Sequence, residues 1–188
     1  TKEFIAGTGG FAVKIALMDD CEPVLAVVYA PVFKSLYSGL RDGLATRQTG
    51  RNPPQFLAAA ENRKNRLRAL FNATHADRTL YDIQRERFLE CGIALPRRPG
   101  QVPGLPRNLR VAEGLSDFHL ATGCDPLLTQ GGYVWDNAAD YLILKNAGGE
   151  MRRLTDGAPL TFGEPRALMP SYITIGDKKL WKKLFPEP

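Results

Sequence analysis

The order of apolar patterns along the chain is the feature that most constrains its fold. The first 50 residues contain four successive strand-like segments, and the remainder alternates segments of helical and strand-like composition. A run of antiparallel strands followed by alternating helices and strands predicts layers in which helices pack against sheets. We therefore expect an α/β fold of the layered α+β kind.

The four segments at the start are rich in β-branched and aromatic residues and are separated by turn residues. They span Phe11–Met18, Val24–Tyr29, Ser35–Ser38 and Leu44–Arg47. Pro31 ends the second segment, because proline has no amide hydrogen to donate to a neighbouring strand. The pattern predicts an antiparallel meander. The polar residues 48–55 form the best connector, so we predict one domain over residues 1–50 and a second over 51–188.

The second part of the chain alternates helices and strands. Its clearest helix is Trp135–Ala147, which carries Ala138, Ala139 and Leu142 on one side and is stopped by the glycines at 148 and 149. Further helices are expected at 57–66, 78–91, 109–115 and 178–185. Strands are expected at 67–73, 117–120, 150–154 and 172–175.

Composition argues against several classes of protein. No apolar run approaches the ~20 residues of a membrane-spanning helix. The net charge of +5 comes from basic residues spread along the chain, a distribution typical of a solvated surface that would also help to attract a small anionic substrate. We expect neither nucleic acid nor a membrane as partner. The three cysteines, Cys21, Cys91 and Cys124, lack the spacing of a metal or disulfide framework. An odd count fits a reducing compartment, so we expect a cytoplasmic protein.

Two segments carry a resemblance to a known family. The chain starts Thr1-Lys2-Glu3-Phe4, and Trp135-Asp136-Asn137-Ala138-Ala139 follows much later. They resemble the motifs Asp-Pro-Ile/Leu-Asp-Gly-Thr-Lys-Glu-Phe and Trp-Asp-x-Ala-Ala-Gly of the inositol monophosphatase superfamily, especially its bisphosphate nucleotidase branch. The resemblance implies the C-terminal part of an α-β-α-β-α sandwich, beginning at the threonine of the Asp-Gly-Thr motif.

The resemblance also implies a chemistry. In that family, Mg²⁺ ions held by carboxylates activate a water that attacks a phosphate monoester. Asp136 would be a metal ligand and Thr1 the catalytic threonine, while the other carboxylates lie upstream of the position that Thr1 matches. We therefore expect a hydrolase of phosphoric monoesters whose Mg²⁺ site needs an N-terminal segment or a second chain. The alternative for Asp136 is an N-cap of its own helix.

The substrate-binding segments of the family are altered here. Its Ser-Arg-Ser-His segment corresponds to residues 72–75, and its Gly-Ser-Ser-x-Lys segment corresponds loosely to residues 103–107. By resemblance, the substrate-binding candidates are Thr74, His75, Gly104 and Arg107. Ala121 stands where the family has an arginine, and Asp140 stands where the Trp-Asp motif ends in glycine. His119 is expected to be structural.

Two further hypotheses follow from this altered pocket. A self-cleaved relative would use the N-terminal Thr1 as a nucleophile for acyl or amide chemistry, with its own α-amine as the base and Asp136, His75 or Lys2 as neighbours. A non-catalytic pseudo-phosphatase would act as a binding subunit. The simplest explanation of a start at Thr1 is a fragment of a longer polypeptide. An exposed sheet edge near residues 1–30 would then require a covering partner.

Overall fold

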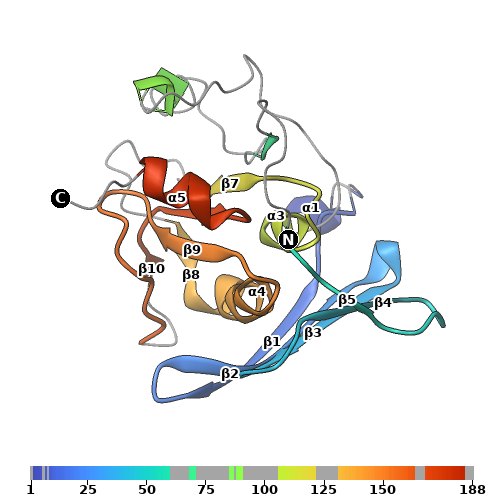
Figure 1. Cartoon of the computed structure of the whole chain (residues 1–188). Helices are drawn as coiled ribbons and strands as arrows, with labels where there is room; N and C mark the ends of the chain where they lie inside the picture. Colours follow the sequence, from blue (N-terminus) through green and yellow to red (C-terminus); the bar gives the residue numbers. More distant parts are fainter. Residues whose placement is uncertain are drawn as a thin grey trace.

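Two sheets lie on opposite sides of one long helix in this computed structural model (Figure 1). The structure describes residues 2–5, 7, 9–59, 68–70, 85–86, 88–90, 106–121, 131–163 and 168–184. Within these residues the mixed α/β layering expected from the order of elements is confirmed.

The first sheet, sheet A, is an antiparallel meander of five strands in the order β1-β2-β3-β4-β5. The strands are β1 (Val13–Asp19), β2 (Glu22–Ala30), β3 (Ser35–Leu40), β4 (Thr46–Thr49) and β5 (Gln55–Phe56). Pro31 begins the short 3-10 turn η1 (Pro31–Phe33) directly after β2, as expected. The connector predicted at 48–55 is partly wrong, because its ends belong to β4 and β5. The division at residue 50 remains a prediction.

The strand register gives sheet A two different faces. On the inner face, Ala16 lies opposite Ala26, which lies opposite Gly39. On the outer face, Leu17 lies opposite Leu25, which lies opposite Leu40. Apart from the partly buried Lys14, the residues of the inner face are mostly small or fully buried, whereas all three of these outer leucines are exposed.

The helix α4 (Val134–Asn146) packs on the inner face of sheet A. Its apolar side chains Ala138, Leu142 and Ile143 join Ala26 and Val28 in the larger core. The approach is close at Gly39, where an added Cβ would lie 3.5 Å from the Ile143 Cα atom. The small residues of β1 to β3 therefore allow helix and sheet to meet directly (Figure 1).

The second sheet, sheet B, has four strands in the order β6-β7-β11-β9. They are β6 (Ala69–Leu70), β7 (Phe118–Ala121), β11 (Tyr172–Ile175) and β9 (Glu150–Arg153), and only the β6–β7 pair is parallel. The helix α5 (Lys178–Leu184) places Leu180, Trp181 and Leu184 in a second core with sheet B. A separate two-stranded ribbon pairs β8 (Gly132–Tyr133) with β10 (Leu168–Met169).

Other elements agree with the sequence to different degrees. The helix α3 (Arg107–Ala112) begins and ends earlier than the predicted 109–115. The described part of the predicted helix 78–91, residues 85–86 and 88–90, is helical, whereas residues 57–59 are not, contrary to the helix predicted there. A short helix, α1 (Lys2–Ile5), was not predicted. No helix in the described ranges has the length and apolar character needed to cross a membrane.

Candidate functional site

Asp136 lies in the first turn of α4. The helix begins after Tyr133, whose backbone is extended, and Asp136 is its third residue. The alternative role of Asp136 as an N-cap is therefore wrong, because the cap position is Tyr133 and no side chain caps the helix. Its carboxylate is exposed, and no hydrogen bond or ion pair joins it to another described residue. A carboxylate near a helix N-terminus is also favoured by the helix dipole.

A buried polar network lies directly beneath this turn. Asn108 of α3 is at its centre, and its amide nitrogen donates to the Oδ2 atom of Asp140 at 3.1 Å and to the hydroxyl of Tyr172 at 3.2 Å. The side-chain Oδ1 atom of Asn108 accepts a hydrogen bond from the Thr174 hydroxyl at 2.7 Å and lies 3.0 Å from the Nδ1 atom of His119. Both ends of one amide are thus satisfied by partners from three other elements.

The network joins the two helices that carry site candidates. Asn108 follows Arg107, the first residue of α3, and Asn137 follows Asp136 in α4. The Tyr172 hydroxyl donates to the side-chain Oδ1 atom of Asn137 at 2.5 Å, and the side-chain Nδ2 atom of Asn137 donates to the backbone carbonyl oxygen of Tyr133 at 3.0 Å. The residues next to Arg107 and Asp136 are therefore held by one set of buried contacts.

His119 is neutral within this network. Burial lowers the pKa of its imidazole to about 3, and the charges of Arg107 and Lys14 act in the same direction. Because the Asn108 oxygen can only accept, a neutral imidazole must carry its proton on Nδ1 to complete the bond. The structural role expected for His119 agrees with this environment. Burial likewise raises the pKa of the Tyr172 hydroxyl, which therefore stays protonated.

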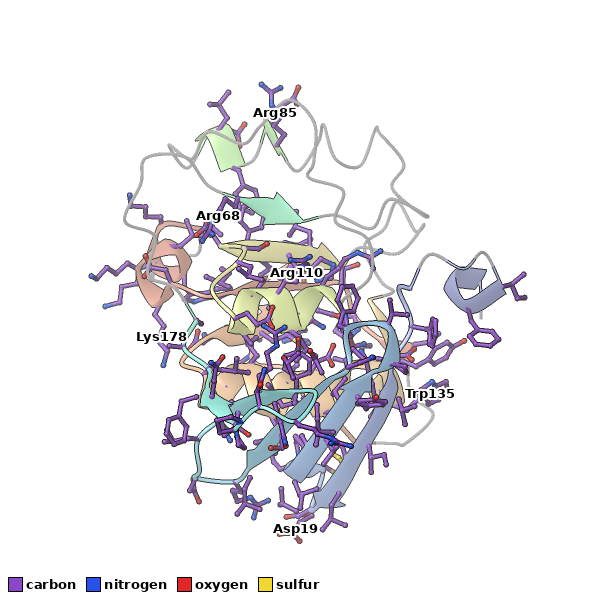
Figure 2. All side chains as sticks on the ribbon, turned by 90° about the vertical axis from the view of Figure 1, so that its right-hand side faces the viewer. Asp19, Arg68, Arg85, Arg110, Trp135 and Lys178 are labelled. Atoms are coloured by element: carbon purple, nitrogen blue, oxygen red, sulfur yellow. The ribbon has the colours of Figure 1, made fainter. Side chains whose placement is uncertain are left out.

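Asp140 introduces a charge into this buried region. Its side chain is only 1% exposed, and its Oδ2 atom forms an ion pair with the Lys14 ammonium group at 2.8 Å. Lys14 also donates to the Asp136 carbonyl oxygen at 2.6 Å. The Oδ1 atom of Asp140 is buried without a hydrogen-bond partner among the described residues. Figure 2 labels Trp135, the neighbour of Asp136, beside the strands of sheet A.

A second polar cluster fixes α3 to sheet A. Glu113, directly after α3, accepts a hydrogen bond from the Tyr37 hydroxyl at 2.8 Å and forms an ion pair with Arg47 at 2.9 Å. Burial and the Glu113 charge raise the pKa of Tyr37. The other carboxylate oxygen of Glu113 is buried and has no hydrogen bond within the described part of the chain. Glu113 therefore anchors the end of α3 to β3 and β4 of sheet A.

The remaining site candidates lie outside the described residues. These are Thr1, Thr74, His75 and Gly104. Of the six residues predicted from the resemblance, the structure therefore describes Asp136 and Arg107. Sequence reasoning missed Lys14, Asn108 and Asn137. The signal that could have found Lys14 is Asp140, because an acidic residue on the apolar side of a predicted helix needs a cation nearby.

Asp136 is the one predicted metal ligand, and it lies within the residues that the structure describes. Carboxylate oxygens are suitable ligands for Mg²⁺, and the exposed carboxylate of Asp136, which no described residue engages, has the chemistry of such a ligand. No three His, Cys, Asp or Glu residues in the ranges that the structure describes are grouped so that they could hold a metal ion.

Comparison with known proteins agrees with this architecture. A model of the "Inositol monophosphatase family" matches residues 1–186, and the chain belongs to that family. The 3'(2'),5'-bisphosphate nucleotidase CysQ of Escherichia coli (strain K12) is 58% identical over 176 residues, which cover 86% of this chain and 58% of the relative. CysQ of Aggregatibacter actinomycetemcomitans is 27% identical over 191 residues, covering 98% of this chain and 64% of the relative.

The fold also has counterparts among solved structures. The crystal structure of CysQ from Bacteroides thetaiotaomicron superposes with a TM-score of 0.70 at 24% sequence identity. The match covers 93% of this chain and 65% of that chain. The present chain thus spans less than two thirds of the length of these relatives.

Proposed function

We propose that this chain is the C-terminal part of a Mg²⁺-dependent phosphomonoesterase that hydrolyses a small anionic phosphate monoester. Membership of the inositol monophosphatase family supports this activity, and the CysQ relatives suggest 3'(2'),5'-bisphosphate nucleotides as the first substrates to test. The observation that carries the proposal is Asp136, whose carboxylate is exposed and unengaged by described residues in the first turn of α4.

In this proposal Asp136 is one metal ligand among several. Bound Mg²⁺ would neutralise phosphate charge and lower the pKa of a water molecule. Arg107, a permanent cation at the start of α3, would bind the anionic substrate together with Thr74, His75 and Gly104. Thr1 would orient the attacking water.

The outer face of sheet A suggests where the rest of the protein belongs. This face presents exposed apolar side chains from three neighbouring strands: Val13, Ile15, Leu17, Leu25, Tyr29, Leu36 and Leu40. A continuous apolar face of this kind marks an interface, and β1 is an edge strand of the sheet. We propose that a segment upstream of Thr1 covers this face and supplies the missing carboxylates. The relatives, of which this chain spans less than two thirds, are long enough to contain such a segment.

Phosphate release by the full-length protein tests the proposed activity. With adenosine 3',5'-bisphosphate as the substrate, we expect activity that requires Mg²⁺ and is lost on chelation. Asp136→Asn should lower kcat/KM by about 100-fold or more, since a catalytic metal contributes several kcal/mol to the transition state. Asp19→Asn is the matched control, because Asp19 is an exposed carboxylate in an ion pair at the β1–β2 hairpin. Equal loss in both variants, or Mg²⁺-independent hydrolysis, would contradict the proposal.

The alternative functions predict different results. Thr1 as an autoprocessing nucleophile remains a prediction, since no described contact involves that residue. Intact-mass measurement would reveal two polypeptides separated before Thr1, and Thr1→Ala would abolish the cleavage. Absence of hydrolysis together with absence of Mg²⁺ binding would favour a non-catalytic subunit. A cytoplasmic location also remains an expectation.

A further inference from the structure

Lys14 occupies an unusual position for a cation. It lies in the middle of β1 on the inner face of sheet A, opposite Val28, which is itself opposite Tyr37. Both of these neighbours are fully buried. The Lys14 side chain is only 20% exposed, so its charge needs a defined partner at the interface with α4.

The ammonium group of Lys14 contacts the two ends of one helical turn. It donates to the carbonyl oxygen of Asp136 at 2.6 Å and to the Oδ2 atom of Asp140 at 2.8 Å. In an α-helix the carbonyl oxygen of residue 136 also accepts the amide hydrogen of residue 140. Lys14 therefore reinforces the turn whose first residue is the proposed metal ligand.

The partner carboxylate has little freedom to move. Asp140 is 1% exposed and also accepts a hydrogen bond from Asn108 at 3.1 Å. Separating a buried carboxylate from its cation strongly destabilises the folded protein. The ion pair therefore holds β1 and α4 close together. Through Asn108 the same contacts reach α3, where Arg107 is the preceding residue.

We propose that Lys14 is a positioning residue that, with Asp140, fixes the first turn of α4 and so places Asp136 in the site. This inference rests on the proposed function only for the role of Asp136. The Trp-Asp-x-Ala-Ala-Gly motif of the resemblance has glycine at the position of Asp140. The Lys14–Asp140 ion pair would therefore be specific to this chain and not part of that motif.

A simpler explanation would be that Lys14 only compensates the buried charge of Asp140. Two variants separate these roles. Lys14→Met leaves a buried unpaired carboxylate and should lower the Tm by roughly 10 °C. Adding Asp140→Asn removes that charge and should restore most of the Tm, yet the donor to the Asp136 carbonyl oxygen is still missing.

Hydrogen exchange of the full-length protein, followed by mass spectrometry, reports how strongly the turn is protected against local opening. We expect exchange over residues 134–140 to accelerate about tenfold in both Lys14→Met and the double variant, since a hydrogen bond from a charged donor is lost. The single variant Lys14→Arg keeps the positive charge and should keep the amides of residues 134–140 protected as in the wild-type protein. Arg41→Met is the matched control, because Arg41 pairs with Asp19 on the surface of the same sheet.

The outcomes decide between the two roles. In the double variant, wild-type exchange over 134–140 would overturn the positioning role, and so would an acceleration of the same size throughout sheet A. In the phosphatase assay, the double variant should need several-fold more Mg²⁺ for half-maximal rate, and an unchanged requirement would also count against the inference. Because exchange needs neither metal nor substrate, it still decides the role of Lys14 if the wild-type protein releases no phosphate.

Discussion

At the scale of single residues, the site depends on buried polar side chains that share hydrogen bonds, so replacing one of them leaves its partners without a hydrogen bond. Asn108 uses both its donor and its acceptor end, and its partners are themselves buried. A buried polar group that loses its partner costs more free energy than the bond itself contributes. Conservative changes at this residue should therefore have large effects.

Asn108→Ala tests this dependence. The substitution leaves Asp140, Thr174 and His119 without a shared partner, so we expect the free energy of unfolding to fall by about 3 kcal/mol or more. Urea denaturation measures the loss. Asn146→Ala is the control, since Asn146 makes a single exposed hydrogen bond to the Leu40 carbonyl oxygen at 2.8 Å. A similar small loss in both variants would contradict the central role of Asn108.

His119 predicts a pH dependence of stability. Its folded-state pKa of about 3 lies below the ordinary value of 6.5, so the unfolded chain binds the proton more readily. The stability contributed by the neutral imidazole is present above pH 6.5 and is lost as the pH falls toward 3, reaching about 2 kcal/mol of loss at pH 5. The chain has two histidines, so His75→Gln isolates the NMR signal of His119. An NMR titration of the His119 imidazole with its midpoint between pH 5 and 8 would contradict the burial of this side chain.

At the scale of elements, packing decides what the sequence pattern leaves open. The strands β1 to β3 could be predicted because composition, turn residues and Pro31 all agreed, whereas β4 (Thr46–Thr49) lies two residues later than expected. The strand β5 could not, because two residues show no period and are defined only by pairing with β4. Within the site, Trp135–Ala147 predicted the helix of Asp136, but Lys14 and Asn108 become neighbours only through tertiary contacts. Because Lys14 and Asn108 are far apart in the sequence, the polar network could not be predicted from it.

Gly39→Val tests the close contact between α4 and sheet A. A Cβ at this position would lie 3.2 Å from the Asn146 side chain and 3.5 Å from the Ile143 Cα atom. We therefore expect a loss of about 1–3 kcal/mol in the free energy of unfolding from overpacking. Gly163→Val is the control, because no described residue has an atom within 4 Å of its added Cβ. Thermal denaturation that ranks the two variants in the opposite order would contradict the close approach.

At the scale of the whole molecule, sheet A has one covered face and one apolar exposed face. The cover of the inner face is α4. An uncovered outer face should make the isolated 188-residue chain self-associate. In sedimentation velocity we expect oligomers that Ile15→Lys and Leu17→Lys reduce, since both side chains are 59% exposed on that face. A monodisperse monomer without bound detergent would contradict an uncovered interface.

We propose that Asp136 completes a metal site whose other ligands come from an upstream segment. Titration calorimetry with Mg²⁺ tests it most directly. The full-length protein should bind Mg²⁺ saturably, while the isolated chain and the full-length Asp136→Asn variant should bind it at least about tenfold more weakly, since each lacks ligand carboxylates. Equal binding by the isolated chain, or an unchanged affinity in Asp136→Asn, would contradict the claim.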